Sequence, residues 1–437
     1  MKKVYFIVLL FVFFMLLTNS ETIAGDIVDI LKEKGVITED EAKEVKASHS
    51  TKEKHLNVLE KMSFKGDLRL RHDTQWRDTG DDDYGRNRER YRIRFGVKAK
   101  TTENTEVGFR LASGSGYQNT TNQSFDEHAR GKGIFIDRAY ASWKPNDTVK
   151  IIGGKHANPL LTTSLVWDSD VKPEGVSECL DFDVSDDVDI FFNLGQWIIE
   201  ELDIKDTDKD PTLLAYQAGI TMKPSKDVKL DIAGSFYDFI NMDAMKWKSG
   251  ILSDKSEFLG YNNTHSQQMV FDNQGNLLNE FRCLELVAKL KLKDLFPKPF
   301  SLFGSFIMNA DADVDELIEE GADPGDSNPP DLKAYSGDDR DTGWLIGFSL
   351  GNKKKKGDWY TKYFYQELED YAFPAVFVDS DFHGGGTNNK GHCIQGQYLL
   401  ASNIHVKGTL FSTKREDESM DGQKDEDRIQ LDLIFKF

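Results

Sequence analysis

The sequence predicts an all-β fold: a transmembrane antiparallel up-and-down β-barrel of sixteen strands, preceded by a short N-terminal periplasmic helical segment. Three observations predict it. Apolar and polar residues alternate within the candidate strands, the connections are alternately long and short, and an export signal precedes them. Mean hydropathy is −0.52, as in a soluble protein, but lumen-facing polar residues and lipid-facing apolar residues cancel in such an average.

The chain begins with a segment typical of a secretory signal peptide. Lys2 and Lys3 precede an apolar run over residues 4–17, and small and polar residues up to Ala24 offer a cleavage site. The run is too short for a membrane helix, and no later stretch has about 18 consecutive apolar residues. We therefore expect residues 1–24 to be removed on export.

Residues 25–62 show helical features in place of alternation. Gly35 is a helix stop, and Thr38 with Glu41 matches a capping box, in which each side chain satisfies the other residue's backbone donor. We expect a periplasmic helical segment that serves as a solvated spacer. A coiled-coil or cell-wall contact is the alternative.

From residue 63 to the end, the chain is a succession of predicted strands. In the last one Leu431, Leu433 and Phe435 share one parity, while Gln430 and Asp432 share the other. One face is therefore apolar and the other polar, as in a strand between lipid and water; an edge strand of a soluble sandwich is the alternative. The predicted strands are 64–72, 90–100, 105–113, 134–143, 149–155, 175–182, 188–196, 212–222, 228–237, 281–292, 300–309, 342–350, 358–367, 391–400, 403–411 and 428–437.

The connections between these strands carry the strongest signal. Short turns alternate with long polar loops, as an up-and-down barrel with short periplasmic turns and long outer loops requires. This rhythm puts both chain ends in the periplasm, whereas a soluble sandwich has turns at more even spacing. The long loops are expected at 73–89, 114–133, 156–174, 197–211, 238–280, 310–341, 368–390 and 412–427.

Composition and motifs argue against several classes of protein function. The formal net charge of −19 argues against a nucleic-acid partner, because phosphate contacts require basic patches. The three cysteines are far apart and match neither a disulfide framework nor a zinc site. The chain contains no G-x-S-x-G, P-loop or H-E-x-x-H motif, so we expect no enzyme activity and no cofactor.

Several stretches resemble one family, the group usually called putative porins. The resemblance extends over residues 26–175 and thins afterwards, and Leu160 stands where the family usually has Phe after Asn-Pro. The stretches are Gly35-Val36-Ile37-Thr38, Ser63 to Arg71, Arg90-Tyr91-Arg92-Ile93-Arg94, Gly108 to Gly114, Asp137-Arg138-Ala139-Tyr140, Gly154-Lys155, Asn158-Pro159, Val166-Trp167-Asp168-Ser169-Asp170 and Glu174-Gly175.

The resemblance implies a channel for small polar or charged solutes in the outer membrane of a Gram-negative bacterium. Barrels of this size in such families are often trimers, so a homotrimer in outer-membrane lipid is expected. The terminal strand, ending on Phe437, resembles the closing strand of outer-membrane barrels, which implies recognition by the barrel assembly machinery. A surface receptor or adhesin on a barrel scaffold is the alternative function, and an outer-membrane hydrolase is a weaker one.

Arginines recur on the lumen-facing parity of the first three strands. Antiparallel neighbours should bring them together as one basic patch on the inner wall, unless they only pair with local acids. The expected pore-lining residues are Arg69, Arg71, Arg90, Arg92, Arg94 and Arg110.

The third long loop is expected to narrow the lumen, because the resemblance implies that this loop folds inward. It carries Trp167, Asp168, Asp170 and Glu174, whose carboxylates would face the arginines across a constriction. The pair of aspartates could instead hold a cation such as Ca²⁺, but no further ligand follows at ordered spacing. We expect weak anion preference despite the net charge. The acidic loop 310–341 is expected to be a solvated outer loop, with cation collection as the alternative.

Overall fold

The chain consists of two compact units, residues 1–63 and 64–437. The computed structural model describes residue 38 and residues 61–78, 83–201, 210–244, 277–294, 296–315, 317, 339–416 and 425–437. The predicted signal peptide, nearly all of the predicted helical segment and most of the acidic loop 310–341 lie outside these residues. Among the described residues, no helix is long and apolar enough to cross a membrane.

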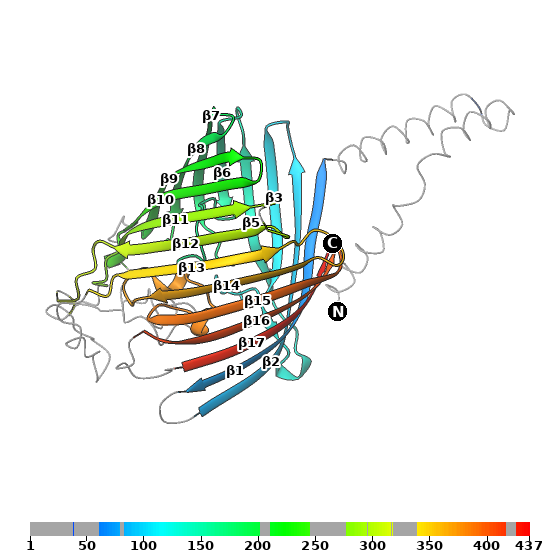
Figure 1. The fold of residues 1–437 in the computed structure, drawn as a ribbon, viewed down its shortest axis with the longest axis vertical. Helices are drawn as coiled ribbons and strands as arrows, with labels where there is room; N and C mark the ends of the chain where they lie inside the picture. The colour runs from blue at the N-terminus through cyan, green and yellow to red at the C-terminus, as the bar shows by residue number, and fades with distance from the viewer. Residues whose placement is uncertain are drawn as a thin grey trace. The chain divides into compact units, whose positions relative to one another are not determined.

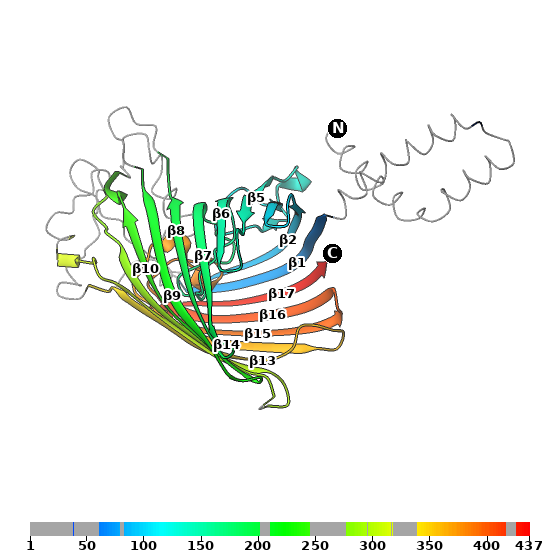
Figure 2. The ribbon, with the colours of Figure 1, turned by 90° about the horizontal axis from the view of Figure 1, so that it is seen from above.

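The second unit is a closed antiparallel β-barrel of sixteen strands with one extra short strand, β4 (Figures 1 and 2). Each barrel strand pairs with its neighbours along the chain, and β1 closes the barrel by pairing with both β2 and β17. The strands are β1 (Met62–Asp78), β2 (Asp83–Lys100), β3 (Thr105–Ser113), β4 (Gln123–Ser124), β5 (Ile134–Trp143), β6 (Val149–Lys155), β7 (Glu174–Ser185), β8 (Val188–Ile198), β9 (Thr212–Ser225), β10 (Val228–Ile240), β11 (Arg282–Leu292), β12 (Phe300–Asn309), β13 (Thr342–Gly351), β14 (Trp359–Leu368), β15 (Asn389–Ala401), β16 (Ile404–Arg415) and β17 (Asp425–Lys436).

The predicted barrel of sixteen antiparallel strands is confirmed, and each predicted strand corresponds to one barrel strand. The predicted first long loop, 73–89, is wrong in extent, because β1 runs to Asp78 and β2 begins at Asp83. The polar residues assigned to that loop include Asp73 and Arg88, which form an ion pair with a nitrogen–oxygen distance of 2.7 Å. Both residues belong to strands and face the lumen. The segment was predicted as a loop because lumen-facing strand residues are as polar as loop residues.

The strand alternation separates an apolar outer face from a polar inner face. In β17 the Leu431 side chain is 54% exposed, whereas Arg428 and Asp432 are each only 2% exposed. This burial pattern is the reverse of that in a soluble protein. It follows from closure of the barrel, because the polar side chains face the lumen and the apolar side chains face the lipid. Trp76 and Trp143, each 51% exposed, lie near strand ends, where aromatic residues suit the membrane interface.

The last residue takes part in closing the barrel. The Gly66 and Phe437 backbones exchange two hydrogen bonds, with nitrogen–oxygen distances of 2.7 and 3.0 Å. A Cβ atom at Gly66 would overlap the Phe437 ring, so the terminal aromatic ring lies directly over this glycine. Glycine is therefore the residue type that permits the contact between the two chain ends of the barrel.

Two loops fold against the inner wall. The loop 156–173 follows β6, and the loop 369–388, with short 3₁₀ turns at Ala375–Phe377 and Phe382–Gly384, connects β14 to β15. Trp167 of the first stacks on Phe377 of the second, with ring centroids 5.3 Å apart, and the Asp168 amide donates to the Phe377 carbonyl at 2.7 Å. Phe373 of the second loop packs edge-on against Tyr237 of β10. One apolar cluster thus fixes both loops inside the barrel.

Candidate functional site

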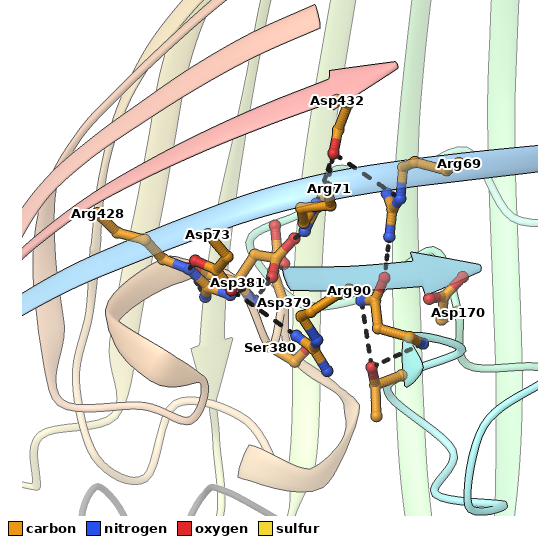
Figure 3. A network of polar contacts seen from close by, with 12 residues as sticks. Arg69, Arg71, Asp73, Arg90, Asp170, Asp379, Ser380, Asp381, Arg428 and Asp432 are labelled. Atoms are coloured by element: carbon orange, nitrogen blue, oxygen red, sulfur yellow. Dashed lines mark hydrogen bonds and ion pairs between the residues drawn. The ribbon is translucent and has the colours of Figure 1, made fainter. Parts of the chain in front are cut away.

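Arg71 is the centre of a charged network on the inner wall (Figure 3). It lies opposite Asp432 in the β1–β17 ladder and donates to both its carboxylate oxygens, from Nε at 2.7 Å and Nη2 at 3.0 Å. Its remaining nitrogen, Nη1, contacts the Asp381 carboxylate of loop 369–388 at 3.1 Å. A planar guanidinium suits such paired contacts, and closure of the barrel supplies the first partner.

Arg428 of β17, which lies opposite Gln75 in the same ladder, makes a similar set of contacts diagonally across to β1. It donates to both Asp73 carboxylate oxygens at 2.9 and 2.8 Å, and its Nη2 lies 3.0 Å from the Asp381 carboxylate. Its Nη1 also donates to the Asp381 carbonyl at 2.9 Å. Asp381 therefore bridges two buried arginines on adjacent strands, as Figure 3 shows. Burial would raise the pKa of Asp381, but Arg428 and Arg71 outweigh it and hold this pKa well below its usual range.

The other predicted arginines extend the wall along β1 and β2. Arg92 and Arg94 share the Asp67 carboxylate, each with a contact of 2.8 Å. Arg90 lies 3.8 Å from Asp73, and Arg69 contacts Asn122 and lies 3.9 Å from Asp432. Five of the six predicted arginines thus form one patch, which is defined as the arginine wall: Arg69, Arg71, Arg90, Arg92 and Arg94. The sixth, Arg110 of β3, pairs with Asp137 of β5.

The predicted loop residues have different surroundings. Asp170 faces the arginine wall, 3.7 Å from Arg94, and accepts a hydrogen bond from the Thr121 hydroxyl at 3.0 Å. Asp168 turns toward the other loop and accepts from the Ser380 amide at 2.9 Å. Glu174 is the first residue of β7 rather than part of the loop, and its carboxylate pairs with Lys155, not with the arginines.

The two loop aspartates differ in their ionisation. Burial raises the pKa of Asp168 well above its ordinary value, and the carboxylates of Asp379 and Asp170 raise it further. Burial also favours the neutral form of Asp170, but Arg92 and Arg94 overcome it and lower its pKa. In the part of the chain that the structure describes, no group of three His, Cys, Asp or Glu side chains is arranged to hold a metal ion.

Sequence reasoning missed the acidic segment of loop 369–388. Asp379-Ser380-Asp381 repeats the Asp-x-Asp spacing of residues 168–170, which was the available signal. Burial and the neighbouring Asp381 raise the pKa of Asp379 to about 6. The acidic side of the network therefore comes from two loops and from the strands themselves, and loop 156–173 supplies only part of it.

A cavity of about 760 Å³ lies beside these loops. The arginine wall contributes Arg69, Arg71 and Arg92, and the loops contribute four aspartates. Four lysines on the lumen-facing parity of their strands also line it, and none of them is among the expected pore-lining residues: Lys289, Lys291, Lys362 and Lys407.

Comparison with known proteins gives a family and a fold. Residues 71–280 and 277–437 match the model of a family described as putative porin. The chain is similar in fold to Pseudomonas putida OprB in its high-pH structure, at 11% identity and a TM-score of 0.51, covering 87% of this chain and 96% of that chain. It is also similar to Salmonella typhi OmpF in complex with daunomycin, at 10% identity and a TM-score of 0.48, covering 86% and 97%. No curated protein matches the sequence.

Proposed function

The chain belongs to the putative porin family and forms a porin-type channel of the outer membrane, and from this premise we propose that its lumen passes small polar and charged solutes by passive diffusion. The observation that carries the proposal is the arginine wall, a dense set of charges on the inner face of a closed barrel. Charged groups lining a water-filled lumen orient polar solutes and select among ions.

We propose that the arginine wall and the facing carboxylates of Asp170 and Asp381 set the selectivity. Every wall arginine lies within 4 Å of a carboxylate that it shares with another arginine, as Arg92 and Arg94 share Asp67. With the neighbouring Arg88, Arg428 and Lys407, eight cations of this region share five carboxylates, so positive charge is in excess; the carboxylates are Asp67, Asp73, Asp170, Asp381 and Asp432. Fields fade within roughly 8 Å at physiological salt, so this local excess should outweigh acids at the outer mouth and give weak anion preference.

The test is the reversal potential across a salt gradient in planar bilayers, for the native protein and for Arg92→Ala with Arg94→Ala. The double variant removes two positive charges and leaves Asp67 without its partners, so its preference should shift toward cations. Lys98→Ala is the matched control, because Lys98 lies on the same strand near its short-turn end and pairs with Glu106. Strong native cation selectivity, or an unshifted double variant, would contradict the proposal, and absence of conductance would favour a receptor or adhesin.

We further propose the cellular setting expected from the sequence. Residues 1–24 direct export, residues 25–62 lie in the periplasm, and the barrel assembly machinery recognises the strand that ends on Phe437. The backbone contacts of Phe437 with Gly66 support a role of the last residue in closure. Deletion of Phe437 should impair membrane insertion while leaving export intact, which fractionation and the mobility of unheated samples would measure.

We propose a homotrimer as the assembled state, on the basis of the resemblance and the strand number. Mass measurement in mild detergent tests this directly. A single monomeric species at every detergent concentration would end the proposal without affecting the channel itself.

A further inference from the structure

A row of polar side chains crosses seven adjacent strands of the inner wall. Residues paired directly across antiparallel strands share a face of the sheet, so a chain of such pairs traces one line around the barrel. Starting at Lys291 of β11, the ladder pairs run through Ser301, Ser349, Lys362, Gln395, Thr409 and Gln430. All seven line the cavity of about 760 Å³, and together they are called the polar belt.

The belt begins near the short-turn end of the barrel, in β11 to β14, and reaches the middle of the strands in β15 to β17. Lys291 is the penultimate residue of β11, before the turn to β12, and Lys362 is the fourth residue of β14, after the turn from β13. Lys407, the fourth residue of β16, lines the same cavity beside the belt. In the topology proposed above, this end faces the periplasm, away from the long outer loops.

The lysines of this cavity differ in their counter-charges, and Lys291 already lies 3.6 Å from the Asp231 carboxylate. Among the residues that the structure describes, Lys362 forms no ion pair; its Nζ lies 4.7 and 5.1 Å from the ring centroids of Phe364 and Phe303. Lys407 lies 3.4 Å from Asp432, but that carboxylate already accepts two hydrogen bonds from Arg71. A lysine ammonium that contacts only aromatic rings has N–H donors available for a solute, because an ammonium carries three of them.

The acids of the cavity are directed elsewhere. Asp381 bridges the two arginines of β1 and β17, and Asp170 faces Arg94. Asp168 accepts from the Ser380 amide, and Asp379 accepts from the Asp381 amide at 2.9 Å. Asp379 acts on Lys362 through space but forms no ion pair with it. The side of the cavity formed by the belt is therefore positively charged and rich in hydroxyl and amide groups.

We propose that the polar belt binds a hydroxylated organic monocarboxylate of sugar size, a proposal that rests on the channel function and names its solute class. The carboxylate supplies the counter-charge that Lys362 lacks. Hydroxyls of the solute fit Ser301, Ser349 and Gln395, since hydroxyl and amide side chains both donate and accept. One face of the solute lies against the Phe303 ring. The cavity volume is in the range of small-molecule sites.

Lysine suits a site on a diffusion path. Its ammonium is a hydrated point charge on a flexible stem, unlike the arginine fork that holds carboxylates and phosphates in two-point contact. Conduction requires binding that is strong enough to attract a solute and weak enough to release it. Successive charges and hydroxyls along the belt meet that requirement, and they favour a carboxylate with several hydroxyls over a compact inorganic anion.

The experiment measures block of single-channel current in planar bilayers by glucuronate, with glucose and inorganic phosphate as comparison solutes. Glucuronate should reduce the current at concentrations where glucose and phosphate do not. Lys362→Met keeps the length of the side chain and removes its charge, and it should weaken the block about tenfold, the loss of one charge-assisted hydrogen bond. Lys362→Arg should largely restore it.

Lys293→Met is the matched control, because Lys293 is an exposed lysine in the turn just beyond β11, where its Nζ donates to the Lys226 carbonyl. It should leave the block unchanged. The proposal would be overturned if glucose or phosphate blocked the current as strongly as glucuronate does. It would also be overturned if glucuronate blocked the Lys362→Met channel as strongly as the native channel. If Lys362→Met fails to insert, Lys407→Met takes its place, with about a threefold weaker block expected.

Failure of this proposal is distinguishable from failure of the channel function. A protein that conducts but ignores glucuronate refutes the belt as a carboxylate site and leaves the channel intact. A protein that does not conduct refutes the channel, and calorimetric titration of glucuronate into detergent-solubilised native and Lys362→Met protein then decides on the belt alone.

Discussion

Asp381→Asn should loosen loop 369–388 from the inner wall. The Asp381 carboxylate lies 3.1 Å from Arg71 and 3.0 Å from Arg428, and its side chain is 28% exposed. Both arginines keep a second carboxylate after the substitution, Asp432 and Asp73 respectively, so neither is left as an unpaired buried charge. The loss is therefore confined to the contacts between the loop and the wall.

The loss of docking free energy for loop 369–388 can be estimated from those two contacts. A hydrogen bond to a charged group contributes about 1.5–3 kcal/mol when buried, and partial exposure and a residual neutral bond from Asn reduce the sum. A net loss of about 2 kcal/mol shifts the docked–undocked equilibrium of the loop roughly thirtyfold, at about 1.4 kcal/mol per factor of ten. Phe382 still packs against Phe364 and Phe411, with ring centroids 6.0 and 6.1 Å away, so the opening should be local.

Chymotrypsin cleavage of the folded protein measures this opening, because residues 369–388 contain four aromatic residues and no lysine or arginine. Cleavage after Phe382 should accelerate roughly thirtyfold in Asp381→Asn when opening is rapid and reversible. Asp379→Asn is the matched control, since the Asp379 carboxylate accepts the Asp381 amide and forms no ion pair among the described residues. Unchanged cleavage in Asp381→Asn, or an equal increase in the control, would refute the role of the bridge.

Three further outcomes are expected. Because the pKa of Asp379 is raised to about 6, this acid gains a proton as the pH falls from 7 to 5, which makes the lumen more positive; the reversal potential should shift toward anions, and Asp379→Asn should reduce the shift. Gly66→Val should reduce barrel closure, because its side chain overlaps the Phe437 ring; an unheated gel should show less compact barrel, with Gly85→Val, in open space, unaffected. Trp167→Ala should cost about 3–5 kcal/mol of docking energy for loop 156–173 through the lost contact with Phe377, seen as faster hydrogen exchange of that loop, and unchanged exchange would contradict it.

The strands were predictable because their signal is local. Alternation with period 2 needs only a few neighbouring residues, and β3, β5, β6 and β12 have the expected bounds. The strand ends were harder, because a lumen-facing polar residue and a loop residue have the same composition. Asp73 and Gln75 were therefore assigned to a loop, although both are buried on the inner wall.

The arrangement of the charges could not be predicted from neighbouring residues. Arg71 and Asp432 are 361 positions apart, and only closure of the barrel places them opposite each other. The inward position of loop 369–388 depends likewise on distant partners, since Phe373 packs on Tyr237 of β10. Aromatic residues within an otherwise polar loop were the available signal, but they do not identify the wall against which the loop packs.

The net charge of −19 does not determine the sign of the field in the lumen, because distance along the strands separates the charges. Asp311 follows β12 at the long-loop end, whereas Lys291 lies near the opposite end of β11, which is 11 residues long. At about 3.3 Å per residue, roughly 30 Å separates the two, which is about four screening lengths at physiological salt. Side chains on adjacent strands are only about 5 Å apart, so the wall charges act on one another almost unscreened. The field that a solute meets in the cavity is therefore set by the arginine wall, the lysines and the two inward loops, and acids at the mouth influence entry more than selection.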